Sequence, residues 1–200
     1  MMSQDMKTPL SQWALYMLDS YRRDESPGDD KTGKLQKKRQ PNQEVWFLPG
    51  SFGNQDIITR NDIDIPAGRK LFCVAASGDQ STAERPCNES TTPQELRQRA
   101  EDTLDRFNEA YVEIDGQKYS KDKGLQKVVT EPFDIKFVEG NPYATEYGVK
   151  AGPAKMVCAA LVAYVGPLSE GKHKITVYSK RNDDNFQVNV VYNVRVLPPT

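Results

Sequence analysis

The stretches Val45-Trp46-Phe47-Leu48-Pro49-Gly50, Ile65-Pro66-Ala67-Gly68-Arg69-Lys70-Leu71-Phe72 and Leu168-Ser169-Glu170-Gly171-Lys172-His173-Lys174-Ile175-Thr176-Val177 decide the fold class of this chain. Each joins an apolar or alternating run to a corner made by Gly or Pro, which is typical of a strand that enters or leaves a β-sandwich. None of the three contains a catalytic signature. They therefore predict an architecture rather than an activity.

Further strands are predicted from alternation and from turn residues at short intervals. The whole set is 44–48, 57–63, 70–76, the hairpin 111–119, 133–138, 156–165, 173–179 and 186–197. The run 156–165 is almost entirely apolar, which indicates a central strand covered on both faces. Because no strand–helix–strand rhythm is present, we expect a mainly β fold, an antiparallel β-sandwich of the jelly-roll or Ig-like type.

Two helices accompany these strands. Thr92-Pro93-Gln94-Glu95 is a capping box, and it predicts a helix over about 92–108 that packs on the sandwich. A second helix is expected from Thr8 to about Arg23, with Trp13, Met17 and Tyr21 on one face.

The chain is predicted to divide into an N-terminal arm, residues 1–43, and a sandwich domain, residues 44–200. Residues 24–43 contain almost no large apolar side chain except Leu35 and are rich in charged residues, Gly and Pro. Such a segment is expected to be an extended or mobile connector between the first helix and the sandwich.

Together with Trp13-Ala14, Asp30–Gly33, the helix near Leu96 and Val191–Val196, the three opening stretches resemble a group of uncharacterised, mostly secreted bacterial proteins. That group shares a Trp-Phe-Leu-x-Gly, Pro-Ala-Gly-Lys, Leu-Ser-x-Gly-x-His-x-Ile pattern in this order. The resemblance implies the sandwich and no particular activity. The chain departs from the pattern by lacking an export signal and by having Asn61-Asp62 where the relatives usually have a cysteine.

Composition limits the classes of partner. Charged residues make up 28% of the 200 residues, yet the net charge is −1, so nucleic acid is an unlikely partner by electrostatics alone. No apolar run is long enough to cross a bilayer, and Met1–Lys7 lacks the pattern of a signal peptide. We therefore expect cytoplasmic synthesis and no membrane partner.

Few residues could carry metal or redox chemistry. The three cysteines lack Cys-x-x-Cys spacing. Cys73 and Cys158 lie in apolar runs and are expected to be buried free thiols, whereas Cys87 lies in a polar loop. The single histidine, His173, follows a glycine turn at the start of a strand, where a structural, hydrogen-bonded imidazole is favoured over catalysis. No catalytic residue, metal ligand set or cofactor is predicted.

Three other patterns are weaker indications of function. The acidic residues Asp56, Asp62, Asp64, Glu113, Asp115, Glu131 and Asp134 could supply a carboxylate pair for glycoside hydrolysis, but solvated strand ends are favoured. The oxygen-rich stretch 24–33 has some character of a calcium loop, and 34–39 is a short basic run. A solvated linker is the favoured interpretation of both.

The favoured function is a non-enzymatic structural protein that assembles with other protein subunits, as a homo-oligomer or within a larger assembly such as a virion, where it would decorate or cement the capsid. Trp13, Met17 and Tyr21 are the predicted partner contacts, because a lone amphipathic helix can bury its apolar face only against another protein surface. The alternative is a carbohydrate- or small-ligand-binding module that uses Trp46, Tyr143 and Tyr147. A glycoside-type hydrolase is the third possibility.

Overall fold

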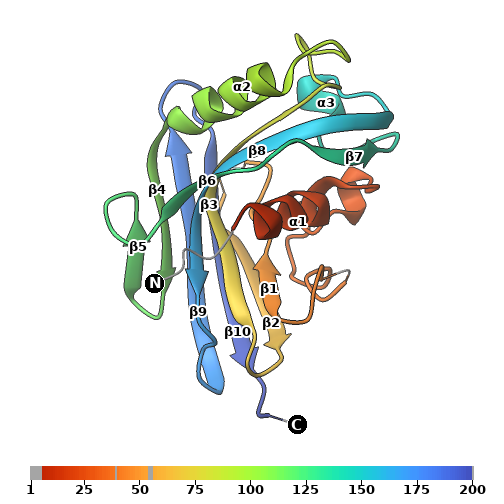
Figure 1. The fold of residues 1–200 in the computed structure, drawn as a ribbon. Coiled ribbons are helices and arrows are strands. Elements are labelled where there is room, and N and C mark those ends of the chain that lie inside the picture. The colour runs from red at the N-terminus through yellow and green to blue at the C-terminus, as the bar shows by residue number, and fades with distance from the viewer. Residues whose placement is uncertain (1–5, 39, 54–55, 200) are drawn as a thin grey trace.

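The computed structural model describes residues 6–38, 40–53 and 56–199, and within them two five-stranded sheets pack face to face (Figure 1). Residues 1–5 of the predicted N-terminal arm and residue 39 of its basic run lie outside the described residues. The first sheet has the order β1-β3-β8-β6, with β7 also paired to β8, and the second has the order β2-β10-β9-β4-β5. This arrangement confirms the predicted β-sandwich.

The strands of the first sheet are β1 (Val45–Leu48), β3 (Lys70–Ser81), β6 (Gln126–Val129), β7 (Phe133–Phe137) and β8 (Gly152–Val165). Those of the second are β2 (Ile58–Ile65), β4 (Phe107–Ile114), β5 (Gln117–Ser120), β9 (Gly171–Arg181) and β10 (Gln187–Val196). β1 pairs parallel with β3 and β2 pairs parallel with β10, whereas the other pairs are antiparallel. The sheets are therefore mixed.

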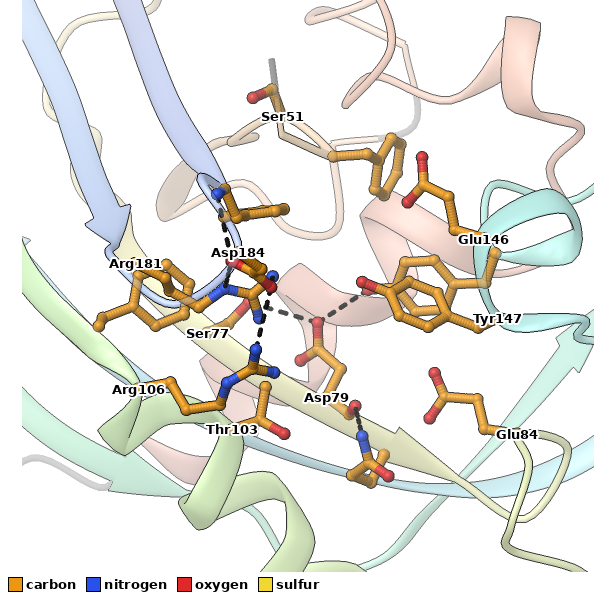
Figure 2. Close-up of a pocket in the computed structure, with 15 residues that line it drawn as sticks. Ser51, Ser77, Asp79, Glu84, Thr103, Arg106, Glu146, Tyr147, Arg181 and Asp184 are labelled. Carbon is orange, nitrogen blue, oxygen red and sulfur yellow. Dashed lines mark hydrogen bonds and ion pairs between the residues drawn. The ribbon is translucent and has the colours of Figure 1, made fainter. Parts of the chain in front are cut away.

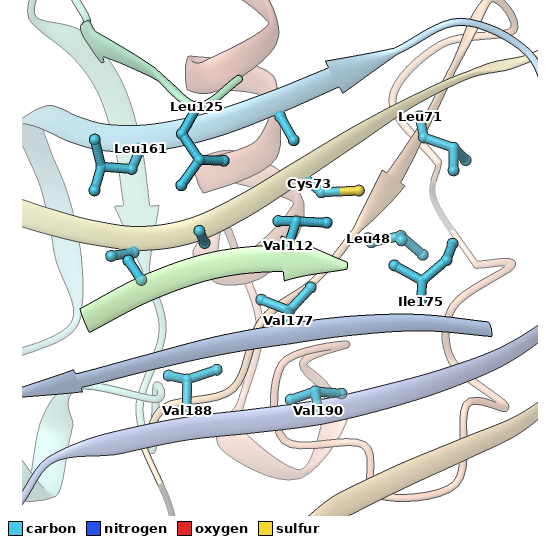
Figure 3. Close-up of a cluster of buried hydrophobic side chains, with 14 of the residues drawn as sticks. Leu48, Leu71, Cys73, Val112, Leu125, Leu161, Ile175, Val177, Val188 and Val190 are labelled. Carbon is cyan, nitrogen blue, oxygen red and sulfur yellow. The ribbon is translucent and has the colours of Figure 1, made fainter. Parts of the chain in front are cut away.

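Strand β8 is covered on both faces, as its apolar run predicts. Val157, Ala159, Leu161 and Ala163 belong to the core between the sheets, and the alternate residues Met156, Cys158, Ala160 and Val162 belong to a second cluster on the outer face. Figure 3 shows the core between the sheets, where Leu161 and Cys73 from the first sheet meet Val112 and Val177 from the second. The period of two thus places two hydrophobic clusters on one strand.

Local signals in the sequence set several boundaries. Helix α2 (Pro93–Asp105) begins with the predicted capping box, in which Glu95 Oε2 accepts from the Thr92 backbone N–H at 2.7 Å. Asp115 and Gly116 both have positive φ, as the turn between β4 and β5 requires. Gly78 in β3 allows α2 to lie close to the sheet, because a Cβ there would meet Ala100 O at 2.1 Å.

Helix α1 (Lys7–Leu18) lies across the outer face of the first sheet (Figure 1). Trp13, Met17 and Tyr21 are only 4%, 3% and 6% exposed, and the Trp13 indole N–H donates to Leu48 O at 3.0 Å. This placement differs from the expectation that these side chains face a neighbouring subunit. The outer face of the first sheet is itself apolar and needs a cover, and α1 supplies it.

The connector is held by α1, by its own hydrogen bonds and by Arg60 of β2, which donates to Asp30 O and Gly28 O, and this corrects the expectation of a mobile segment. The Ser26 hydroxyl donates to Met17 O at 2.6 Å, and Tyr16 donates to the main-chain oxygen of the fully buried Gln36 at 2.8 Å. Asp30 accepts from the backbone N–H groups of Thr32 and Leu35. Because polar groups make these contacts, the low hydropathy of the segment does not reveal them.

Replacing Trp13 with phenylalanine tests this placement. The change retains an aromatic ring and removes the hydrogen bond to Leu48 O, so the buried carbonyl loses its donor. We expect the free energy of unfolding to fall by about 1–3 kcal/mol, measured by urea denaturation, with no change in the mass seen by light scattering. An altered mass with unchanged stability would contradict the intramolecular role of α1.

The remaining elements are short, and the cysteines agree with expectation. A 3₁₀ turn (Arg23–Glu25) and helix α3 (Ala144–Tyr147) complete the described secondary structure. Cys73 and Cys158 are buried and Cys87 is half-buried, all as free thiols. Within the described residues, no helix is long and apolar enough to span a membrane, and no cluster of three or more His, Cys, Asp or Glu side chains is placed to hold a metal ion.

Candidate functional site

A cavity of about 240 Å³ lies beside the second half of β3 (Figure 2). β1 pairs only with Lys70–Cys73, so no described strand covers that edge of β3 beyond Cys73. The segment after β1, the end of α2, helix α3 and the β9–β10 turn enclose the space instead. The short length of β1 therefore creates the cavity.

Asp79 of β3 contributes an acidic group to this cavity. Its Oδ2 accepts from the Tyr143 hydroxyl at 2.9 Å and from the Ser77 hydroxyl at 3.3 Å. Its Oδ1 is shielded from solvent and has no hydrogen-bond partner of acceptable geometry in the described part of the chain, although the residue as a whole is only partly buried. Burial raises the pKa of Asp79, and the hydrogen bonds from Cys158, Tyr143 and Ser77 only partly offset this effect.

Glu84 is the second acid of the cavity and is 4% exposed. Its Oε2 accepts from the Ser81 backbone N–H at 3.1 Å. Burial, together with the negative charge of Asp79, raises the pKa of Glu84 to about 8 even though the Ser81 N–H favours the carboxylate. Neither Glu84 nor Asp79 forms an ion pair within the described residues.

The basic groups of the cavity are already paired with other acids. Arg106 lies 2.6 Å from Asp183 and 3.0 Å from Asp184, and Arg181 lies 2.7 Å from Asp184. The Arg181 guanidinium also stacks over the Phe186 ring, 4.2 Å from its centroid. These arginines therefore shape one wall without balancing the charge of Asp79 and Glu84.

Aromatic rings form the opposite wall. Tyr143 lies edge to face with Phe52 and with Tyr147, at centroid distances of 5.9 and 5.2 Å. Tyr147 is 44% exposed at the mouth. Of the three aromatic residues predicted for ligand binding, Tyr143 and Tyr147 thus line the cavity, whereas Trp46 is buried in the core between the sheets and does not.

The acids named from the sequence do not gather in one place. Asp62, Asp64 and Asp115 line an open groove on the second sheet. Glu131 pairs with Lys7 and Arg97, and Asp134 pairs with Lys155. The remaining two, Asp56 in the segment before β2 and Glu113 on β4, do not line the cavity. None of these acids lines the cavity beside β3, and Asp62, Asp64 and Asp115 share the open groove instead.

His173 lies in that open groove with both ring nitrogens engaged. Nδ1 is 2.6 Å from Asp115 Oδ2 and Nε2 is 2.8 Å from Ser169 O. Burial opposes the charged ring, but these acceptors raise the pKa of His173 above its ordinary value. The geometry agrees with the predicted hydrogen-bonded, structural imidazole.

Sequence reasoning missed Asp79 and Glu84. The predicted strand ends at residue 76 and the next predicted helix begins at about residue 92, so both acids lie outside every predicted element. The signal in the sequence was the pair Gly78-Asp79 directly after an apolar strand. A glycine within a strand often marks a position where a ligand or another backbone segment comes close. The cavity itself depends on where β1 ends, and the sequence of β3 gives no information about that.

No protein family, curated protein or solved structure matches this chain.

Proposed function

We propose that this chain is a non-enzymatic β-sandwich that binds a small polar ligand in the cavity beside β3. The observation that carries the proposal is the carboxyl of Asp79 in the cavity wall, one oxygen of which is shielded from solvent and has no hydrogen bond of acceptable geometry in the described part of the chain. An unsatisfied buried polar group costs about 1–3 kcal/mol. A ligand that donates a hydrogen bond to this oxygen would remove that cost.

The composition of the walls supports the same function. Binding sites for small molecules combine apolar and aromatic surface with a few polar groups that fix orientation. Here Phe52, Tyr143 and Tyr147 provide rings, and Asp79 and Glu84 provide acceptors. Buried acids with raised pKa values occur preferentially at functional sites.

Assembly with other subunits, including the setting of a virion, stays a prediction from the sequence. Its main support was an arm free to dock elsewhere, and the apolar residues of that arm are buried within this chain. The cavity requires no partner chain, which is why we place ligand binding ahead of assembly.

A thermal-shift screen tests the proposal. We expect at least one compound in a panel of small sugars, polyols, amino acids and amines to raise the melting temperature of the wild-type chain. Ligand at 100 times its Kd stabilises the folded state by about 2.7 kcal/mol, which corresponds to roughly 5–10 °C for a chain of this size.

The matched variants are Asp79→Asn, which changes the cavity acid, and Asp134→Asn, which changes an acid paired with Lys155 elsewhere on the same sheet. The shift should diminish in the first and persist in the second. Equal shifts in all three proteins would contradict a role for the cavity. NMR spectra should show the ligand chemically unchanged, and the appearance of products would overturn the non-enzymatic function.

A further inference from the structure

We propose that the ligand is a small organic amine, whose ammonium group is held between the carboxylates of Asp79 and Glu84 while its carbon skeleton lies against Phe52 and Tyr147. This inference rests on the proposed function, because it names the chemical class of ligand for the same cavity.

The charge balance of the walls is the first argument. Four acids line the cavity, Asp79, Glu84, Glu146 and Asp184. Asp184 is paired with two arginines, and Glu146 lies 3.3 Å from Arg23. Asp79 and Glu84 are left without a described cationic partner. Two neighbouring buried carboxyls are stable only when protons or a cation reduce their charge.

Unused hydrogen-bond acceptors are the second argument. Asp79 and Ser51 line the cavity, and Asp79 Oδ1 and Ser51 Oγ are both shielded from solvent and have no hydrogen bond of acceptable geometry within the described residues. An alkylammonium group has three N–H donors and no acceptor, as a lysine side chain does. Its donors match a site rich in acceptors better than a carboxylate or phosphate ligand could.

The aromatic wall is the third argument. Cations are attracted to the faces of aromatic rings within about 6 Å of the centroid. Two rings of this cavity already lie near protein cations, since Arg23 is 5.9 Å from the Phe52 centroid and Arg181 is 4.2 Å from that of Phe186. Tyr147 offers a further ring at the mouth, where it is partly exposed.

Matched amine and alcohol probes test the inference by calorimetry on the full chain. The pairs are n-butylamine with n-butanol, benzylamine with benzyl alcohol, and 2-phenylethylamine with 2-phenylethanol, which have similar shapes and differ in charge. At pH 8.5 we expect at least one amine to bind about 10- to 150-fold more tightly than its alcohol, the range for one hydrogen bond between charged groups.

The pH dependence gives a second readout. An ammonium ion must displace the proton that Glu84 holds below about pH 8, so amine affinity should rise as pH increases from about 6 to 9. An alcohol should not show this rise. Calcium chloride serves as an inorganic cation, and binding of calcium with no amine binding would overturn the inference.

Three variants locate the amine. Asp79→Asn and Glu84→Gln are isosteric, and each should reduce the amine preference at least tenfold. Glu146→Gln changes a cavity acid already paired with Arg23 and should alter it less than about threefold. Thermal melts establish that each variant is folded.

The outcomes separate the two proposals. If no amine is preferred over its alcohol, or if a folded Asp79→Asn variant keeps the preference, the ammonium site is wrong. Binding of sugars or alcohols that still depends on Asp79 would then leave the proposed function standing. If neither these probes nor the wider panel binds, the proposed function falls as well.

Discussion

Replacing Arg60 with methionine is expected to lower the free energy of unfolding by about 3–5 kcal/mol. Arg60 is fully buried on β2, and its guanidinium donates to Asp30 O at 2.7 Å, Pro49 O at 2.8 Å and Gly28 O at 3.0 Å. It also donates to the Tyr192 hydroxyl at 2.9 Å. Methionine fills much of the same space and removes the guanidinium donor from Asp30 O and Gly28 O, whereas Pro49 O keeps the Tyr192 hydroxyl as a donor.

The effect should be both global and local. Arg60 joins the connector to the sandwich, because Gly28 and Asp30 belong to the connector whereas Pro49 and Tyr192 belong to the body. Urea denaturation measures the loss of stability. Limited trypsin digestion should also cut the variant faster than the wild type within residues 24–43, where the chain is rich in Lys and Arg.

Arg195→Met is the matched control. Arg195 lies on β10, next to β2, but its side chain is 60% exposed and pairs with Asp64 at the surface. Exposed pairs contribute about 0–1 kcal/mol, so this variant should remain close to the wild type. If Arg60→Met were no more destabilising than Arg195→Met, the guanidinium contacts would not hold the connector.

Arg60 also explains why the arm was misjudged from the sequence. Ile58 and Arg60 are both buried on β2, two residues apart, as the alternation of a strand requires. Two exposed residues then follow, of which Asp62 has positive φ, and Ile63 is buried again. An arginine on a strand is normally expected to face water. In the connector, the groups that accept hydrogen bonds from Arg60 are the main-chain carbonyls of Gly28 and Asp30. A hydropathy pattern describes side chains and does not predict the contacts of main-chain atoms.

Features that depend only on residues close together in the sequence were predictable. The capping box at Thr92, the turn at Asp115-Gly116 and the double-faced run of β8 each have a local cause, and the structure confirms them. The mixed sheet order was not predictable, because parallel pairs such as β1 with β3 arise from contacts between distant segments. The strand β6, with only four residues, gave no alternation long enough to identify.

The candidate site was predictable only in part. Tyr143 and Tyr147 were predicted as aromatic contacts of a ligand-binding module, and both line the cavity. Asp79 and Glu84 did not stand out among twenty-eight acids, because the burial of Glu84 and the solvent-shielded oxygen of Asp79, not the residue type, make them unusual. Their burial results from α2, α3 and the β9–β10 turn closing over the open edge of β3.

The stability of the unliganded wild-type chain is expected to fall as pH rises from about 4.5 to about 8, and Glu84→Gln should remove most of that fall. Burial raises the folded pKa of Glu84 from 4.5 to about 8. Between these values the folded chain binds more protons at this site than the unfolded chain, so raising the pH favours unfolding. Above about pH 8 the full cost of a buried carboxylate is present.

At pH 9 the Glu84→Gln variant should therefore be more stable than the wild type by on the order of 3–5 kcal/mol, with little difference near pH 4.5, measured by urea denaturation across this range. Glu89→Gln, an exposed position in the same loop, should stay within about 0.5 kcal/mol of the wild type throughout. A wild-type chain that loses no stability relative to Glu84→Gln as pH rises would mean that Glu84 reaches solvent. Because a bound ammonium ion would stabilise the carboxylate, a saturating amine should also reduce the fall in the wild type and leave the glutamine variant unchanged.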